Sequence, residues 1–156
     1  MEATVLEIED FQSEDIMSIN HSQLSCNLII ALAKYRKQYS IMPELEFELS
    51  YGRVKPDISI CNSIKIDWIH DVIRTFETPL TAIEILSPKQ AFNDITDKVY
   101  DIYFPSGVKS CWIIIPVLKT VHVLTPDGKQ QIFQRNEIVI DESTKVELSV
   151  EDIFAE

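Results

Sequence analysis

The ten residues Pro79–Pro88, P-L-T-A-I-E-I-L-S-P, constrain the fold of this chain more than any other segment. A short run rich in Ile and Leu between two prolines is typical of a buried β-strand, and Pro88 cannot extend the ladder of a sheet. The run contains one carboxylate, Glu84. Because burying an unpartnered carboxylate is costly, we expect Glu84 to be paired, protonated or bound to a metal ion.

The composition is that of an ordinary globular protein, with 156 residues, 46% of them hydrophobic and 25% charged. We therefore expect one domain over residues 1–156. No apolar run approaches the roughly 18 residues of a membrane span, and the N-terminus lacks the basic start of a secretory signal. Cys26, Cys61 and Cys111 are odd in number and form no CxxC pair. They predict buried thiols in a reducing cytoplasm.

The net charge of −11 is unevenly distributed. Residues 1–17, which we interpret as an acidic leader, carry a net charge of −6, and residues 136–156 also carry −6. The remaining middle of the chain is therefore close to neutral, at +1. This distribution permits nucleic-acid binding but does not indicate it, because binding to a polyanion is driven by basic side chains.

Apolar spacing predicts the order of the elements. Leu24, Leu28 and Leu32 recur at helical spacing, so we expect a first helix over 20–36 with Asn20 as its N-cap. The alternation in 44–50 predicts a half-buried strand that forms an antiparallel hairpin with 55–61. The other expected elements are a connection with a short helix (62–78), a helix (90–104), strands at 111–115, 120–124, 129–133 and 137–140, and a helical turn at 149–154.

The strand, helix and strand over 80–86, 90–104 and 111–115 imply one parallel pair in an otherwise antiparallel sheet. The predicted fold class is thus α/β, a mixed sheet in the order α-β-β-β-α-β with a C-terminal β-hairpin extension.

Three side chains of this arrangement are candidates for chemistry: Asp57, Glu84 and Lys98. If the strands that carry Asp57 and Glu84 are neighbours, their carboxylates repel each other unless a cation or a shared proton lies between them. Hard oxygen ligands of this kind suit Mg²⁺ or Mn²⁺. The hairpin would also bring Glu46 or Glu48 near Asp57. A lysine at the edge of a helix stripe can extend its ammonium group to such a site.

The motifs P56-D57-I-S-I, I83-E84-I-L-S-P88 and D94-I-T-D-K98, followed by G107-V-K-S-C-W112, resemble the PD-(D/E)XK nuclease superfamily. They are most similar to a bacterial branch of restriction-endonuclease-like proteins. The likeness runs from about His21 to Phe133. It implies a restriction-endonuclease-like fold and a metal-dependent endonuclease that cleaves DNA.

Carried over to this sequence, the resemblance makes Asp57 and Glu84 ligands of Mg²⁺ or Mn²⁺ and Lys98 the catalytic lysine. The superfamily places this lysine two residues after the acid, where this chain has Leu86, so the role passes to the following helix. His21 corresponds to a histidine at the start of the first helix and is an auxiliary candidate, as are Glu46 and Glu48. Because one domain carries one site, cleavage of both strands predicts a homodimer.

Each candidate also has a purely structural interpretation. Glu84 can be an incidental strand residue, Asp57 a strand-start residue after Pro56, and Lys98 a surface lysine paired with Asp94 at i−4. His21 can be a core-edge residue, and Glu46 and Glu48 can form a solvated face. Trp68 and Trp112 are expected to be core or interface anchors. The alternative function is therefore a catalytically inactive binding or regulatory module that keeps the nuclease fold.

Overall fold

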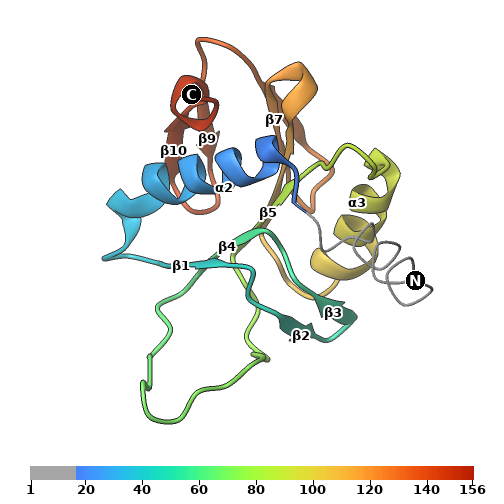
Figure 1. Ribbon diagram of the computed structural model, residues 1–156. Coiled ribbons are helices and arrows are strands. Elements are labelled where there is room, and N and C mark those ends of the chain that lie inside the picture. The colour runs from blue at the N-terminus through green and yellow to red at the C-terminus, as the bar shows by residue number, and fades with distance from the viewer. Residues whose placement is uncertain (1–16) are drawn as a thin grey trace, which may run out of the picture.

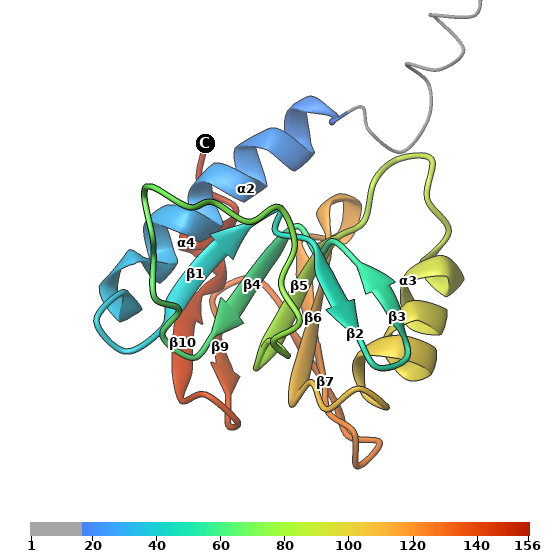
Figure 2. The same ribbon diagram turned by 90° about the horizontal axis from the view of Figure 1, so that it is seen from below.

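A mixed six-stranded sheet runs through the middle of the molecule (Figure 1, Figure 2). The computed structural model describes residues 17–156, so the expected leader lies outside the described residues except for Met17. The strands, in their order across the sheet, are β1 (Ser40–Pro43), β4 (Ile58–Cys61), β5 (Thr81–Ile85), β6 (Ser110–Ile115), β7 (Thr120–Leu124) and β8 (Gln130–Phe133). Only β5 and β6 pair in parallel, which confirms the predicted mixed sheet.

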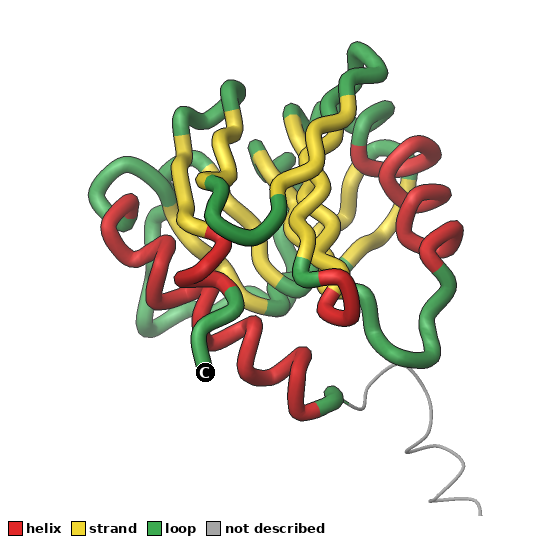
Figure 3. Tube along the Cα trace, turned by 90° about the horizontal axis from the view of Figure 1, so that it is seen from above, coloured by secondary structure: helices red, strands yellow, loops and turns green. Residues whose placement is uncertain are grey.

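Helices and two small sheets cover the two faces of the main sheet (Figure 3). The helical elements are α2 (Ile19–Leu32) with a 3-10 turn at Ala33–Tyr35, α3 (Phe92–Lys98) with a π-helical turn at Val99–Tyr103, a 3-10 turn at Pro116–Leu118, and α4 (Val150–Ile153). The small sheets pair β2 (Phe47–Leu49) with β3 (Gly52–Val54), and β9 (Ile138–Asp141) with β10 (Val146–Ser149). None of the helices described in residues 17–156 has the length and apolar character needed to cross a membrane.

Successive residues of the central strands point to opposite faces and build two cores. On one face Ile58, Ile83 and Trp112 pack with the predicted leucine stripe of α2 and with β9, β10 and α4. On the other face Ala82 and Ile113 pack with α3 and with β2 and β3. Both faces are covered, so β4, β5 and β6 are buried along their whole length.

The N-cap of α2 is Ser18, and the prediction of Asn20 is wrong. Ser18 has an extended backbone, and its Oγ accepts a 3.1 Å hydrogen bond from the backbone N–H of His21. Asn20 already lies inside the first turn, so its side chain is not placed to cap the helix. The earlier start fixes the first turn and, with it, the position of His21.

The predicted hairpin of 44–50 with 55–61 is also wrong. The turn is so tight that Leu49 pairs directly with Gly52, which makes Gly52–Val54 the returning strand β3. Pro56 lacks a backbone N–H and lies after this pairing ends. The next strand, β4, pairs instead with β1, which the sequence analysis missed, and with β5.

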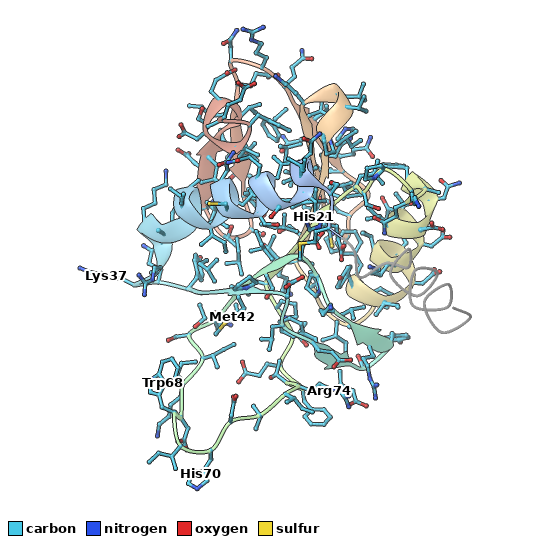
Figure 4. All side chains as sticks on the ribbon, in the orientation of Figure 1. His21, Lys37, Met42, Trp68, His70 and Arg74 are labelled. Carbon is cyan, nitrogen blue, oxygen red and sulfur yellow. The ribbon has the colours of Figure 1, made fainter. Side chains whose placement is uncertain are left out.

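The connection between β4 and β5 contains no helix, contrary to the prediction for 62–78. It is irregular apart from one bridge between Phe47 and Thr75. Trp68 lies on this connection with 92% of its surface exposed, so it is not a core anchor, whereas Trp112 is fully buried. Figure 4 shows Trp68 and His70 far from the body of the protein.

The second predicted helix, 90–104, changes its winding at Lys98. The π-helical turn Val99–Tyr103 adds a residue to the turn, so that Val99 and Tyr103 are fully buried. Ile102, which the helical spacing placed on the buried stripe, is only partly buried. Single π turns are often found at functional sites, and here the turn directs Tyr103 toward β5.

Candidate active site

A cleft of about 1090 Å³ opens where the start of α2, the start of β4, the end of β5 and the helix α3 meet. His21, Asp57, Glu84 and Lys98 all line it, although they come from four different elements or their edges. Figure 4 shows His21 at this meeting point, close to the central strands. The structure therefore brings together four of the six site residues predicted from the sequence.

Asp57 is held by two partners. Its Oδ2 accepts a 2.7 Å hydrogen bond from the backbone N–H of Ile85, the residue after Glu84 on the neighbouring strand. Its Oδ1 lies 2.9 Å from Nε2 of His21. A carboxylate oxygen has two lone pairs, so each oxygen of Asp57 keeps capacity for another ligand.

Glu84 is buried, with 4% of its surface exposed. Its Oε1 accepts a 2.6 Å hydrogen bond from the hydroxyl of Tyr103 and lies 3.4 Å from Nζ of Lys98. Within residues 17–156, no hydrogen bond reaches Oε2. One oxygen of this buried carboxylate is thus fixed by the protein, and the other has no protein partner in the described part of the chain.

The electrostatics of the cleft follow from these contacts. Burial raises the pKa of Glu84, the nearby charge of Lys98 opposes this rise, and the charge of Asp57 adds to it. Burial and the charge of Glu84 keep the pKa of Tyr103 well above its usual value, so the phenol stays a donor. The charge of Asp57 thus disfavours the charged form of Glu84, and a cation near both carboxylates would relieve this repulsion.

His21 lies on the first turn of α2, with its imidazole mostly buried. Its hydrogen bond to Asp57 raises the pKa of His21 against the opposing effect of burial, and the charges of Glu44 and Glu84 act in the same direction as Asp57. His21 therefore favours the positively charged form more than an ordinary histidine does. In that form it is a donor that orients Asp57.

The structure places Glu46 and Glu48 away from the cleft. Glu46 lies 3.4 Å from Nε of Arg74 and 3.6 Å from Nε of Arg53, and Glu48 lies 3.2 Å from Nη1 of Arg74. Of the three glutamates in residues 44–48, Glu44 is the one that lines the cleft. It has a left-handed backbone (φ 51°) directly after β1, and its N–H donates a 3.0 Å hydrogen bond to the carbonyl of Asp57.

Tyr103 is the contact that the sequence analysis missed. Regular helical spacing assigned Ile102 to the buried side, and only the π turn brings Tyr103 there instead. The sequence did contain a signal, because Tyr103, an aromatic residue with a hydroxyl, directly follows Ile102, the last residue of the predicted buried stripe. A buried Tyr normally needs a partner for its hydroxyl, and Glu84 is the one buried acid on the strand that faces it.

The donor set fits a divalent cation bound through few protein ligands. In residues 17–156 no group of three or more His, Cys, Asp or Glu side chains is arranged to hold a metal ion. Mg²⁺, however, is commonly bound by one or two carboxylates together with waters and substrate phosphates. Asp57 and Glu84 supply two hard oxygen donors at the edge of an open cleft, which matches this mode.

Basic side chains surround the acids. Arg53, Lys55, Lys89 and Lys98 line the cleft together with the acids. Among the residues that line the cleft these four cations balance the four acids Glu44, Asp57, Glu84 and Asp94. The cleft is therefore locally neutral, although the whole chain carries a net charge of −11, and it offers cations that can contact an anionic substrate.

Comparison with known proteins shows the fold and the family of the chain. A crystal structure of a putative nuclease of the DUF820 family, from Anabaena variabilis, has a TM-score of 0.75 and 23% sequence identity, covering 90% of this chain and 83% of that chain. This likeness shows a shared restriction-endonuclease-like fold, as the motifs predicted. A search of curated proteins found no match. Residues 12–154 match the family Uma2, described as putative restriction endonuclease, and the chain therefore belongs to that family.

Proposed function

We propose that the protein is a metal-dependent endonuclease that hydrolyses phosphodiester bonds in DNA. The observation that supports this proposal is the convergence of Asp57, Glu84 and Lys98 on one cleft, from residues far apart in the chain. If each of the three residues had only a structural role, their side chains would not need to meet in one cleft. Membership of a family described as putative restriction endonuclease supports the same reaction class.

In this proposal Asp57 and Glu84 hold Mg²⁺ or Mn²⁺, with Oε2 of Glu84 as the donor that no described residue occupies. When bound, such an ion polarises the phosphate and lowers the pKa of a bound water. Tyr103 keeps Glu84 oriented, and the N–H of Ile85 and His21 keep Asp57 oriented. These contacts set the two acids before any ligand arrives.

Lys98 has the role of the catalytic lysine. It is the last residue of α3, its side chain is 29% exposed, and its ammonium lies at the border between Glu84 and the cleft. From there it can orient the attacking water and stabilise the negative charge that develops on the phosphate. Arg53, Lys55 and Lys89 then contact neighbouring phosphates of the same strand.

Cleavage of both strands of a duplex needs two such sites. Because the chain carries one cleft of this kind among its described residues, we propose that it acts as a homodimer. The two clefts would then each cut one strand.

The test is cleavage of assorted single- and double-stranded DNA by the full chain with Mg²⁺, with Mn²⁺ and with EDTA. We expect metal-dependent cleavage that falls about 10²–10³-fold in Glu84→Ala and in Lys98→Ala. Glu48→Ala is the matched control, because neither Glu48 nor its partner Arg74 lines the cleft. Equal activity in the wild type, Glu84→Ala and Lys98→Ala would indicate a contaminating nuclease and contradict the proposal.

One observation favours a second candidate, a catalytically inactive binding module of the same fold. Lys98 already lies 3.4 Å from Glu84, so the buried acid has a protein cation as its partner. A structural ion pair of this kind would leave no role for a metal ion. The two candidates differ in one simple measurement, since only the nuclease site predicts stabilisation by Mg²⁺ or Mn²⁺.

A further inference from the structure

The connection between β4 and β5 carries a group of exposed apolar side chains that the nuclease site does not use. We call residues 65–74 the apolar arm. Trp68 is 92% exposed, Ile69 85%, Val72 72% and Ile73 86%, and Phe76 just beyond the arm is 77% exposed. Monomeric proteins rarely expose apolar patches of more than a few hundred Å². Such a group of side chains therefore indicates a surface that a partner covers.

The arm is fixed at both ends. At its start the N–H of Ile64 donates a 2.8 Å hydrogen bond to Oγ of Ser40, and at its end Thr75 exchanges backbone hydrogen bonds with Glu46 and Glu48. Between these points, in the described part of the chain, the hydrogen bonds of residues 66–73 are local ones to the carboxylates of Asp67 and Asp71. The two ends of the arm are thus fixed, and its middle extends away from the body (Figure 1).

An apolar groove lies where the C-terminal end of α2 meets the edge of the main sheet. It has a volume of about 460 Å³, and Ile29, Ile30, Ala33, Ile41 and Met42 contribute apolar side chains to it. Ile30 is 69% exposed. β1 is the terminal strand, so its outer edge has no partner within residues 17–156. An open strand edge beside an apolar groove is a surface on which an extended segment can dock.

The charges of the arm and the groove are complementary. The middle of the arm, residues 66–73 (I-D-W-I-H-D-V-I), contains two acids and no Lys or Arg; at the ends of the arm, Lys65 is exposed and Arg74 pairs with Glu46 and Glu48. Residues 34–37, K-Y-R-K, contain three basic side chains at the end of α2, and Arg36 lines the groove. Figure 4 places Lys37 and Trp68 on the same side of the molecule. The acids of the arm also make it a poor surface for DNA, because phosphates would be repelled.

We propose that the apolar arm of one copy docks in the groove between α2 and β1 of a second copy, and that the exchange is reciprocal. A twofold dimer uses the same two surfaces on each copy. Stable dimers bury about 800 Å² per partner. A fully buried aromatic side chain accounts for about 150–250 Å². Burial of Trp68 and its apolar neighbours in the groove would therefore cover an area of the order that a stable dimer needs.

Sedimentation of the full chain over a range of concentrations tests the proposal. We expect a wild-type dimer, and we expect Trp68→Ala and Ile30→Glu each to raise the dimer dissociation constant roughly tenfold or more. Val117→Ala is the matched control, because Val117 is 87% exposed but lies on the turn after β6, and we expect it to remain a dimer. A monomeric wild type, or a Trp68→Ala dimer as stable as the wild type, would overturn the proposal.

Cross-linking identifies which surfaces meet. Two chains are mixed under oxidising conditions, one with Trp68→Cys and one with Ile30→Cys, both with the exposed Cys26 replaced by Ser. We expect a disulfide between the two different chains. Disulfides only between two Trp68→Cys chains would assign arm–arm contact instead, and no disulfide would reject the interface. If Trp68→Ala loses DNA binding but stays dimeric, the arm contacts DNA and the proposal is wrong.

This interface does not depend on catalysis. Glu84→Ala, which we expect to abolish cleavage, should dimerise like the wild type. Failure of the nuclease proposal and failure of the dimer proposal are therefore separately observable.

Discussion

The hydroxyl of Tyr103 donates a 2.6 Å hydrogen bond to Oε1 of Glu84, and this contact joins the π turn after α3 to the central strand β5. The contact gives one oxygen of Glu84 a hydrogen-bond donor inside the protein, where the side chain is almost fully buried. The other oxygen has no hydrogen bond within residues 17–156. The position of Glu84 in the cleft is therefore set by a residue to which the sequence analysis assigned no role.

Tyr103→Phe should weaken both folding and activity. Removing the hydroxyl leaves Oε1 of the buried Glu84 with only the more distant ammonium of Lys98, so we expect the free energy of unfolding to fall by about 1–3 kcal/mol. Cleavage should also require a higher Mg²⁺ concentration. Urea unfolding and metal titration of the activity measure the two effects. Tyr100→Phe on the same π turn is the control, because Tyr100 is 48% exposed, and it should resemble the wild type. Identical behaviour of both variants would contradict the assigned role of Tyr103.

Glu84→Gln should separate stability from function. The pKa of Glu84 is raised mainly by burial, so its folded state binds a proton more tightly than its unfolded state. Its charge therefore costs stability as the pH rises above the ordinary pKa of a glutamate. In EDTA at neutral pH we expect the variant to be more stable by about 1 kcal/mol, although it is inactive. Urea unfolding in EDTA measures this. A clearly less stable variant would show that the Lys98 ion pair outweighs the cost of burial.

Mg²⁺ or Mn²⁺ should raise the melting temperature of the wild type. A ligand at about 100 times its dissociation constant stabilises the folded state by about 2.7 kcal/mol. The shift should disappear in Asp57→Asn and in Glu84→Gln and persist in Glu46→Gln, whose side chain pairs with Arg53 and Arg74. Thermal unfolding with increasing metal concentration is the measurement. An equal shift in all four proteins would place the ion elsewhere.

Stability should depend on pH through His21. Its pKa is raised in the folded state, chiefly by the hydrogen bond to Asp57. This contribution is fully present below the unfolded pKa of about 6.5 and is lost as the pH rises through the folded pKa. Measured in EDTA, the stability difference between the wild type and His21→Gln should shrink from about pH 6 to about pH 8. His70→Gln, at an exposed site, serves as control. A difference that does not change with pH would contradict the assignment.

Asp141 should contribute strongly to stability, although it lies far along the chain from Asp57, Glu84 and Lys98. It is fully buried, and its Oδ2 accepts hydrogen bonds from Nε1 of Trp112 (2.7 Å) and from Ser110. These bonds attach β9 to the central strand β6. We expect Asp141→Ala to lower the free energy of unfolding by about 2–4 kcal/mol. The exposed neighbour Glu142, replaced by Ala, should change it by no more than about 0.5 kcal/mol. Equal losses at both positions would contradict the prediction.

The central part of the fold was predictable because its signals are local and strong. Leu24, Leu28 and Leu32 mark the buried side of α2, and the apolar runs of β5 and β6 flank a helix, which dictates a parallel pair. From that pairing it follows that Glu84 lies on an inner strand. Asp57 directly precedes β4, so it can approach Glu84 only if β4 lies beside β5. The two strands do pair, with Ile58 opposite Ile83.

The features that the sequence did not predict are ones that the spacing of apolar residues does not reveal. β1 is short, begins with Ser and ends with Pro, so it has a weak strand signal, and without it β4 was assigned the wrong partner. Trp68, Val72 and Phe76 repeat at helical spacing, but nothing in residues 17–156 covers them, and the segment is not helical. The π turn breaks the 3.6-residue period itself, which is why Tyr103 was missed.

The backbone N–H of Ile85 holds Asp57, so the first acid is oriented by the same strand that carries the second. Asp57 and Glu84 therefore form a rigid unit whose spacing does not change when surrounding segments move. Lys98 is the last residue of α3, which packs on the same sheet through Ile95 and continues into the π turn that carries Tyr103. Packing of this one helical segment therefore positions both the ammonium group of Lys98 and the hydroxyl that orients Glu84, so a change that loosens it would disturb two parts of the cleft together.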